Sequence, residues 1–215
     1  MNRNASRSPF LLGLTGNIAC GKSRVGQLLA ERYGADYIDA DRVVHTLYGA
    51  GTPQTNAIAA RFGTELLTPD GTLERRRLGD IVLADPAALR ELEQILDPGV
   101  RSAIEARIRE SPSAVIVLDA IRLIEGGLYK RCDAVWVVVC DRALQLERLQ
   151  ASRSMSAAQA ELRIASQRPP DEKLRYANAV IHNNSTLDDL ATQVADAWQR
   201  TVAPRLQRAV QSRPP

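Results

Sequence analysis

Apolar residues occur in this chain in two arrangements: in short continuous runs, and at intervals of three or four positions within longer polar stretches. The continuous runs are typical of buried strands; they cover residues 10–15, 37–38, 114–119, 134–139 and 179–181. The spaced positions are typical of helices with one buried face; they cover residues 22–33, 142–151, 156–166 and 186–198. Strands that alternate with helices favour a parallel sheet covered on both faces. The pattern therefore predicts an α/β fold of three layers, α/β/α, with a five-stranded parallel sheet.

Between the second and third predicted strands the pattern is helical throughout. The helical stretches there cover residues 42–47, 73–83 and 86–109. Asp97-Pro98-Gly99 is expected to interrupt the last of them, because proline and glycine are both unfavourable inside helices. We expect residues 66–111 to form a helical lobe for a second substrate, inserted into a core of residues 9–65 and 112–203. Residues 1–8 and 204–215 are expected to be flexible tails.

The sequence Gly-Asn-Ile-Ala-Cys-Gly-Lys-Ser follows the first predicted strand, at residues 16–23. Gly16 and Gly21 permit backbone angles that a side chain would obstruct, so that N–H groups can wrap phosphate oxygens. The helix that begins near Lys22 adds its positive N-terminal end. Lys22 can reach the β and γ phosphates, and the Ser23 hydroxyl can ligate Mg²⁺. Since a strand precedes the loop and a helix follows it, the sequence predicts a nucleoside triphosphate site.

Two residues of this loop have alternative interpretations. The Cys20 thiol lies near Lys22 and a helix start, where a thiol can be acidified, but we favour the interpretation that a small residue fits there. Arg24 follows the serine, and its side chain either touches a phosphate or points to solvent.

Carboxylates end two of the predicted strands. Asp39 and Asp41 follow the strand at 37–38, and Asp119 ends the strand at 114–119. Ligands of open α/β sheets bind beyond these strand ends, and phosphoryl transfer to an alcohol needs a carboxylate that accepts the hydroxyl proton. In an extended backbone Asp39 and Asp41 would share a face. Alternatively Asp41 caps the helix at Arg42, a role that does not exclude catalysis.

Arginines are frequent after the fourth predicted strand, at positions 142, 148, 153, 163 and 168. Such charges usually form a solvated helix face. Arg148 and Arg153 are five residues apart, however, and Gln145 lies one helical turn before Arg148. A closing flap over residues 142–170 would place these cations above the phosphates.

Composition narrows the choice of partners. The net charge is +3 and only 4% of residues are aromatic, which leaves neither the basic stripe nor the stacking platform expected of a nucleic-acid-binding protein. The three cysteines show no disulfide pattern, so a reducing cytoplasm is the simplest location. No apolar run is long enough to span a membrane. His45 and His182 lack partners at metal-ligand spacing.

Several segments, in this order, resemble the dephospho-CoA kinase family, a family of P-loop kinases. The resemblance covers residues 10–198 and rests on these stretches: LTGNIACGKS at 14–23, YIDAD at 37–41, GTP at 51–53, DGTLERRRL at 70–78, LIEGGL at 123–128, QLERL at 145–149, RIASQ at 163–167 and VIHNN at 180–184. No stretch beyond the phosphate loop is specific alone, but the ordered set is.

The resemblance implies ATP-dependent phosphorylation of the ribose 3′-hydroxyl of dephospho-CoA, which gives CoA and ADP in the last step of CoA synthesis. It implies ATP and Mg²⁺ as cofactors, no nucleic-acid or membrane partner, and a cytoplasmic monomer or weak homo-oligomer. By the same comparison the catalytic residues are Asp41, Lys22 and Arg148. The expected ATP contacts are Asn17, Ala19, Cys20, Gly21, Lys22, Ser23, Arg24 and Asn183. The expected acceptor contacts are Asp39, Asp41, Leu123 and Glu125, and the expected metal ligands are Ser23 and Asp119.

The chain departs from the family pattern at several positions. The loop usually has other residues at positions 17, 19, 20 and 24; Asp97-Pro98 stands where His-Pro is usual, and Ile121-Arg122-Leu123 where Pro-Leu-Leu is usual. Two alternatives therefore remain: a nucleoside monophosphate or small-metabolite kinase of the same fold, and a non-catalytic ATP-binding regulator.

Overall fold

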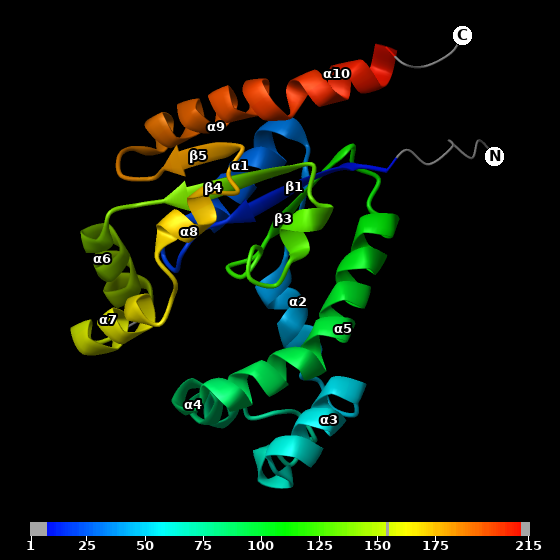
Figure 1. The fold of residues 1–215 in the computed structure, drawn as a ribbon, viewed down its shortest axis with the longest axis vertical. Helices are drawn as coiled ribbons and strands as arrows, with labels where there is room; N and C mark the ends of the chain where they lie inside the picture. Colours follow the sequence, from blue (N-terminus) through cyan, green and yellow to red (C-terminus); the bar gives the residue numbers. More distant parts are fainter. Residues whose placement is uncertain (1–7, 154, 212–215) are drawn as a thin grey trace, which may run out of the picture. The chain divides into compact units, whose positions relative to one another are not determined.

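A computed structural model describes residues 8–153 and 155–211 of the chain (Figure 1). These residues divide into two compact units. The first, called here the sheet unit, comprises the described residues up to Ile38 and from Ser111 onwards; the second, the helical unit, comprises Asp39–Glu110.

The sheet unit is built on five strands in the order β2-β3-β1-β4-β5. The strands are β1 Phe10–Thr15, β2 Asp36–Asp39, β3 Val115–Asp119, β4 Ala134–Val139 and β5 Ala179–His182. The central strand β1 runs parallel to β3 and β4, with Leu14 paired to Asp119 on one side and to Trp136 on the other. The predicted five-stranded parallel sheet and α/β class are confirmed.

Helices α1 (Lys22–Tyr33) and α9 (Leu187–Thr201) cover one face of this sheet. Alternate strand residues such as Leu12 and Trp136 are fully buried beneath them, as the period-two alternation of strand side chains requires. The Tyr33 and Trp198 rings stack at 4.1 Å and join the two helices. The opposite face carries α8 (Pro170–Leu174) and the short helix η2 (Leu128–Arg131).

Two helices of the predicted lid, α6 (Arg142–Arg153) and α7 (Ala157–Ala165), pack against each other (Figure 1). A small apolar cluster joins them to the phosphate loop through Ile18, which packs with Leu149, Ala160 and Ile164. A capping box begins α7, because Ser156 and Gln159 each bond the other's backbone N–H.

The helical unit has its own apolar core and is larger than predicted, since it begins at Asp39 rather than near residue 66. Its helices are α2 (Ala40–Thr46), α3 (Pro53–Phe62), α4 (Arg75–Ala84) and α5 (Pro86–Glu110), with a short η1 (Thr64–Leu66). Both α2 and α3 pack on α5, and Ile58 of α3 is fully buried. Packing on α5 therefore places these two helices in the helical unit.

The expected interruption of the last helix at Asp97-Pro98-Gly99 is wrong. Helix α5 continues through Pro98 and bends part-way along its length (Figure 1), as helices do at proline. A Cβ on Gly99 would lie 2.4 Å from Gln54 Nε2 of α3, so the glycine permits close helix packing. Arg101 Nε also donates to Asp97 at 2.7 Å, one turn away. Tertiary packing thus outweighs the local preference to break the helix.

The expected tail from residue 204 is also wrong for residues 204–211, which belong to helix α10 (Ala203–Gln211). The helix packs on α9, and Leu206 lies against the core of the sheet unit, so burial of one apolar face stabilises it. Residues 1–7 and 212–215 of the expected tails lie outside the described residues. Within the described chain, no helix is both long and apolar enough to cross a membrane.

Candidate active site

The phosphate loop connects β1 to α1, as predicted. Gly21 is the N-cap of α1 with a φ of 95°, and Gly16 has a φ of 150°. A Cβ at Gly16 would lie 2.2 Å from the Val138 carbonyl oxygen, and one at Gly21 would lie 2.0 Å from Asn183 Nδ2. Ala19 also has a positive φ, 59°, at a cost to a non-glycine residue of about 1–2 kcal/mol. The loop therefore holds a tight, preformed turn.

Three consecutive carbonyl groups of the loop are held by side chains from elsewhere in the sheet unit. Gln145 Nε2 donates to Ile18 O at 2.8 Å, and Arg148 Nη1 donates to Ala19 O at 3.3 Å. Asn183 Nδ2 donates to Cys20 O at 2.9 Å. Gln145 and Asn183 are themselves buried, which fixes these donors in place.

The same three contacts orient the N–H groups of the loop. In a trans peptide the C=O of one residue and the N–H of the next point in opposite directions. The amides of Ala19, Cys20 and Gly21 therefore point away from Gln145, Arg148 and Asn183. Cys20 N–H makes only a long turn bond of 3.4 Å to Asn17 O. Together with the first-turn amides of α1, these groups form an anion-binding concavity of the kind that cradles phosphates.

A Gly21→Ala variant is expected to weaken ATP binding by at least about tenfold, because the methyl group would displace the Asn183 amide from Cys20 O. Gly34→Ala is the matched control: Gly34 has a φ of 64°, and its Cβ would meet nothing within 4 Å. The control should lose about 1–2 kcal/mol of stability from backbone strain alone, with ATP affinity unchanged. Calorimetric titration with ATP measures the affinity of both variants. Equal losses of affinity would show that the contact at Gly21 has no bearing on nucleotide binding.

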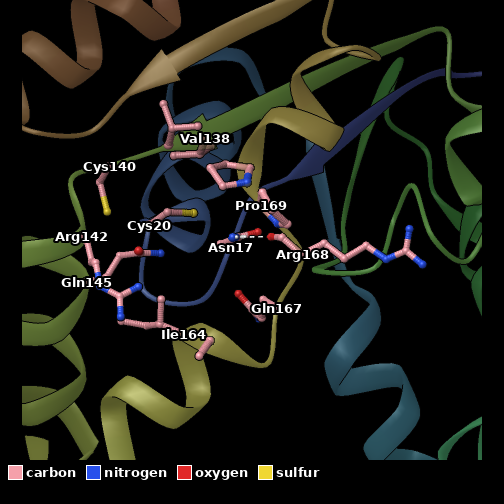
Figure 2. A pocket seen from close by; sticks show the side chains of 13 residues that line it. Asn17, Cys20, Val138, Cys140, Arg142, Gln145, Ile164, Gln167, Arg168 and Pro169 are labelled. Atoms are coloured by element: carbon pink, nitrogen blue, oxygen red, sulfur yellow. Dashed lines mark hydrogen bonds between the residues drawn. The ribbon is translucent and has the colours of Figure 1, made fainter. Parts of the chain in front are cut away.

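A second segment, residues 167–168 at the C-terminal end of the predicted lid, also contacts the phosphate loop. Gln167 Oε1 accepts from Ile18 N–H at 2.7 Å, and Asn17 Nδ2 donates to the Arg168 carbonyl at 3.1 Å. A pocket of about 400 Å³ lies between this segment, the loop, β4 and α6 (Figure 2). Among the described atoms, Oδ1 of Asn17 is buried there without a hydrogen-bond partner.

Two cysteines also line this pocket, Cys20 and Cys140. Burial raises the pKa of the Cys20 thiol above its ordinary value, although the charge of Lys22 acts in the opposite sense. Burial likewise raises the pKa of Cys140 to about 11. Because the thiolate is the nucleophile, these values support the interpretation of Cys20 as a small residue that fits the loop.

The predicted metal ligands lie on neighbouring segments of the sheet unit. Asp119 ends β3 in register with Leu14, directly before the phosphate loop, and is 5% exposed. Its Oδ2 accepts a hydrogen bond from the Tyr37 hydroxyl, which fixes the orientation of the carboxylate. Ser23 is exposed in the first turn of α1. The part of the chain that the structure describes contains no group of three or more His, Cys, Asp or Glu side chains arranged to hold a metal ion. Mg²⁺ in kinases is bound through one or two protein oxygens together with substrate phosphates, so Ser23 and Asp119 fit such an ion.

The structure places Asp39 and Asp41 at different positions of helix α2. Asp39 is the N-cap of α2, where its Oδ1 accepts from Arg42 N–H at 3.1 Å. The alternative in which Asp41 caps this helix is therefore wrong. The expectation that the two share a face of extended backbone is also wrong, because Asp41 already lies in the first turn of α2. Asp41 is exposed.

The loop after β3 carries the two remaining acceptor candidates. Leu123 is fully buried, so it supports the loop rather than offering a surface. Glu125 Oε1 accepts from Lys173 Nζ at 2.7 Å. Burial is the largest influence on this carboxyl and acts to raise its pKa. The hydrogen bond and charge of Lys173, with the charge of Arg122, outweigh it and hold the pKa below its usual value.

The predicted cations differ in what they contact. Lys22 is nearly buried at the start of α1. Arg24 Nη1 donates to Gln27 at 3.4 Å, while its Nε is buried with no hydrogen-bond partner among the described atoms. Arg142 pairs with Glu161, and Arg168 pairs with Glu172 at 3.1 Å. Among the lid arginines whose side chains the structure describes, Arg148 is the one whose guanidinium donates to the phosphate loop, at Ala19 O. The side chain of Arg153 lies outside the described residues.

Three residues with clear roles in this geometry are absent from the predicted site: Gln145, Gln167 and Lys173. The position of Gln145 three residues before Arg148 indicates a shared helix face, and that spacing was a usable signal. Gln167 and Lys173 lie in a polar segment without periodicity, where no local pattern distinguishes a buried donor from a solvated one.

Comparison with known proteins agrees with this geometry. The sequence profile of the dephospho-CoA kinase family matches residues 10–189. A dephospho-CoA kinase from Geobacter metallireducens is 43% identical over 196 residues, 90% of this chain and 97% of that relative. The solved dephospho-CoA kinase from Campylobacter jejuni is 26% identical with a TM-score of 0.63, covering 88% of this chain and 95% of the other. A solved structure from Thermus thermophilus has a TM-score of 0.76 and 26% identity, covering 94% and 98% of the two chains.

The parallel sheet, the Gly-x-x-x-x-Gly-Lys-Ser turn and the side chains that hold it define a P-loop kinase. Because the family profile spans most of the chain and the relatives match nearly end to end, the chain belongs to the dephospho-CoA kinase family.

Proposed function

We propose that this enzyme transfers the γ-phosphoryl group of ATP to the 3′-hydroxyl of the ribose of dephospho-CoA, giving CoA and ADP. The observation that carries the proposal is the phosphate loop, whose amides at 19–21 are turned to one side by Gln145, Arg148 and Asn183. The identity of the acceptor, dephospho-CoA, is inferred from membership of the dephospho-CoA kinase family.

In this proposal the loop amides and Lys22 hold the β and γ phosphates. Arg148 donates to Ala19 O on the side of the loop away from those amides, so it stabilises the charge that spreads over the transferred group once the expected flap at residues 142–170 closes. Preorganised donors are effective because they need not reorient as the charge develops. Of the remaining predicted contacts, Arg24 and Asn17 each have a buried polar atom, Nε and Oδ1, with no hydrogen-bond partner in the described structure, and both suit nucleotide contacts.

The proposed base is Asp41. The acceptor oxygen forms a bond to the γ phosphorus as the bond from phosphorus to the leaving oxygen of ADP breaks, and the hydroxyl proton passes to the carboxylate. Asp39 is a weaker candidate for this role, since its carboxylate is engaged at the helix N-cap.

Ser23 Oγ and the Asp119 carboxylate would hold Mg²⁺, the second through water. When bound, the ion supplies positive charge that neutralises the phosphate oxygens. Tyr37 keeps Asp119 oriented for this role.

We further propose that the enzyme works in the cytoplasm as a monomer or weak homo-oligomer.

The acceptor is tested by measuring ADP formation from MgATP with a panel of acceptors: dephospho-CoA and shikimate, which offer hydroxyl groups, and AMP, which offers a phosphate oxygen. We expect release with dephospho-CoA alone. Turnover of AMP or shikimate with dephospho-CoA untouched would support the small-metabolite kinase instead. ATP binding without turnover of any acceptor would support the regulator.

A further inference from the structure

Lys173 is a buried cation that the phosphate chemistry does not use. It lies on α8 and is 2% exposed. Its Nζ donates to the Ile121 carbonyl at 2.6 Å and to Glu125 Oε1 at 2.7 Å. Burying an ammonium group is costly unless it is paired and hydrogen-bonded, so these partners explain how Lys173 is tolerated. They do not explain why a cation is needed there.

The partners of Lys173 belong to the loop at residues 120–127, which leaves the end of β3 next to Asp119. Thr15 Oγ1, at the end of β1, donates to the same Ile121 carbonyl at 3.2 Å. Turn bonds from Leu123 N–H to Ala120 O and from Gly127 N–H to Ile124 O fix the rest. Thr15 and Lys173 therefore hold the Ile121 carbonyl of this loop from two different elements.

The chain that carries Lys173 also contacts the phosphate loop. Six residues earlier, Gln167 bonds Ile18, and the Arg168 carbonyl bonds Asn17. Pro169 and Pro170 stand between these contacts and Lys173, and proline restricts the backbone. The segment at 167–173 is therefore a short, restrained connection between the nucleotide loop and the loop after β3.

The two carboxylate oxygens of Glu125 differ in their hydrogen bonding. Lys173 occupies Oε1, while Oε2 is buried and has no hydrogen-bond partner in the described part of the protein. A buried, unsatisfied carboxylate oxygen is unfavourable, and a ligand that donates a hydrogen bond would remove this cost. The lowered pKa of Glu125 keeps the carboxylate ionised at neutral pH.

We propose that Lys173 is a positioning residue for the acceptor: it holds Glu125 so that Oε2 accepts a hydrogen bond from an N–H or O–H group of dephospho-CoA. The inference rests on the proposed function, because it names which side chains prepare the acceptor side of the same reaction.

Paired variants distinguish a role of Lys173 in stability alone from a role in binding dephospho-CoA. Lys173→Met leaves the Glu125 charge buried and unpaired, so its Tm should fall. The double variant Lys173→Met with Glu125→Met removes both charges and should recover much of that loss. Under the proposal the KM for dephospho-CoA rises about tenfold or more in both, since the acceptor loses one oriented hydrogen bond. The KM for ATP should stay within about twofold of the wild-type value.

Glu125→Gln tests the same oxygen without removing the Lys173 partner. Its amide oxygen can still accept from Lys173, but the ammonium loses its counter-charge. We therefore expect Tm to fall by less than in Lys173→Met, while the KM for dephospho-CoA rises. Lys130→Met, at an exposed lysine of η2 in the same unit, is the control and should leave both KM values unchanged.

Two results would overturn the inference and leave the proposed function standing: a double variant that recovers the KM for dephospho-CoA together with Tm, or a Glu125→Gln variant with wild-type KM. Wild-type protein that does not phosphorylate dephospho-CoA would overturn the proposed function itself, and this inference with it. The two failures are therefore distinguishable in one set of assays.

Discussion

An Asp41→Asn variant is expected to lose about 10²- to 10⁴-fold in kcat, the usual contribution of a positioned general base. The amide keeps the shape of the side chain but cannot accept the proton of the acceptor hydroxyl. ATP affinity should be nearly unchanged, because the substitution leaves every residue of the phosphate loop at 16–23 unaltered. The measurement is steady-state turnover with dephospho-CoA, paired with a direct ATP titration.

Asp80→Asn is the control for the Asp41 prediction. Asp80 is an exposed carboxylate on α4 of the same helical unit, so the substitution changes the charge equally without touching α2. Its kcat should match that of the wild type. If Asp41→Asn retained turnover within about threefold of the wild type, a change worth well under 1.4 kcal/mol of barrier, Asp41 would be excluded as the base.

An Arg148→Met variant is expected to lower kcat/KM for ATP by about 10³-fold, the lower end of what a charge-stabilising arginine contributes to phosphoryl transfer. Two losses combine in this prediction. The transition state loses a cation, and the loop loses the donor to Ala19 O while Asn183 O loses its partner at 3.0 Å.

Arg148→Lys separates the two effects. It keeps the charge, but a single ammonium group does not reproduce the planar fork that reaches Ala19 O and Asn183 O together. We expect it to recover less than half of the lost free energy. Arg205→Met, which changes an exposed arginine on α10, should behave like the wild type. Wild-type kcat/KM in Arg148→Met would show that neither role matters.

The sheet and the phosphate loop were predictable because their signals are local. Five apolar runs and one Gly-x-x-x-x-Gly-Lys-Ser motif specify the strand, turn and helix without reference to distant residues. The amphipathic spacing of α1, α6 and α9 is equally local. Bounds differed by a few residues, as at α9, which extends to Thr201.

The misjudged elements depend on packing between distant parts of the chain. Pro98 lies inside α5, and the next residue, Gly99, leaves room for Gln54 of α3, a contact that no window of sequence reveals. Helix α10 forms where Leu206 reaches the core of the sheet unit.

The residues of the candidate site likewise fall into those predictable from local sequence and those that depend on the fold. Lys22, Ser23 and Arg148 follow from motif and resemblance, whereas the choice between Asp39 and Asp41 depended on where one strand ends and the next helix begins. Lys173 follows two prolines and two acids in a polar segment, where a lysine usually faces solvent. Only the fold shows that it is buried against Ile121 and Glu125.

The central claim is transfer to one particular oxygen, and the position of the phosphate in the product tests it most directly. Dephospho-CoA offers both a 2′- and a 3′-hydroxyl on the same ribose. After incubation with MgATP and the wild-type enzyme, phosphorus–proton correlation NMR of the product should connect the new phosphate to the ribose H3′. Two results would contradict transfer to the 3′-hydroxyl: a phosphate connected to H2′, or dephospho-CoA recovered unchanged from folded protein that binds ATP.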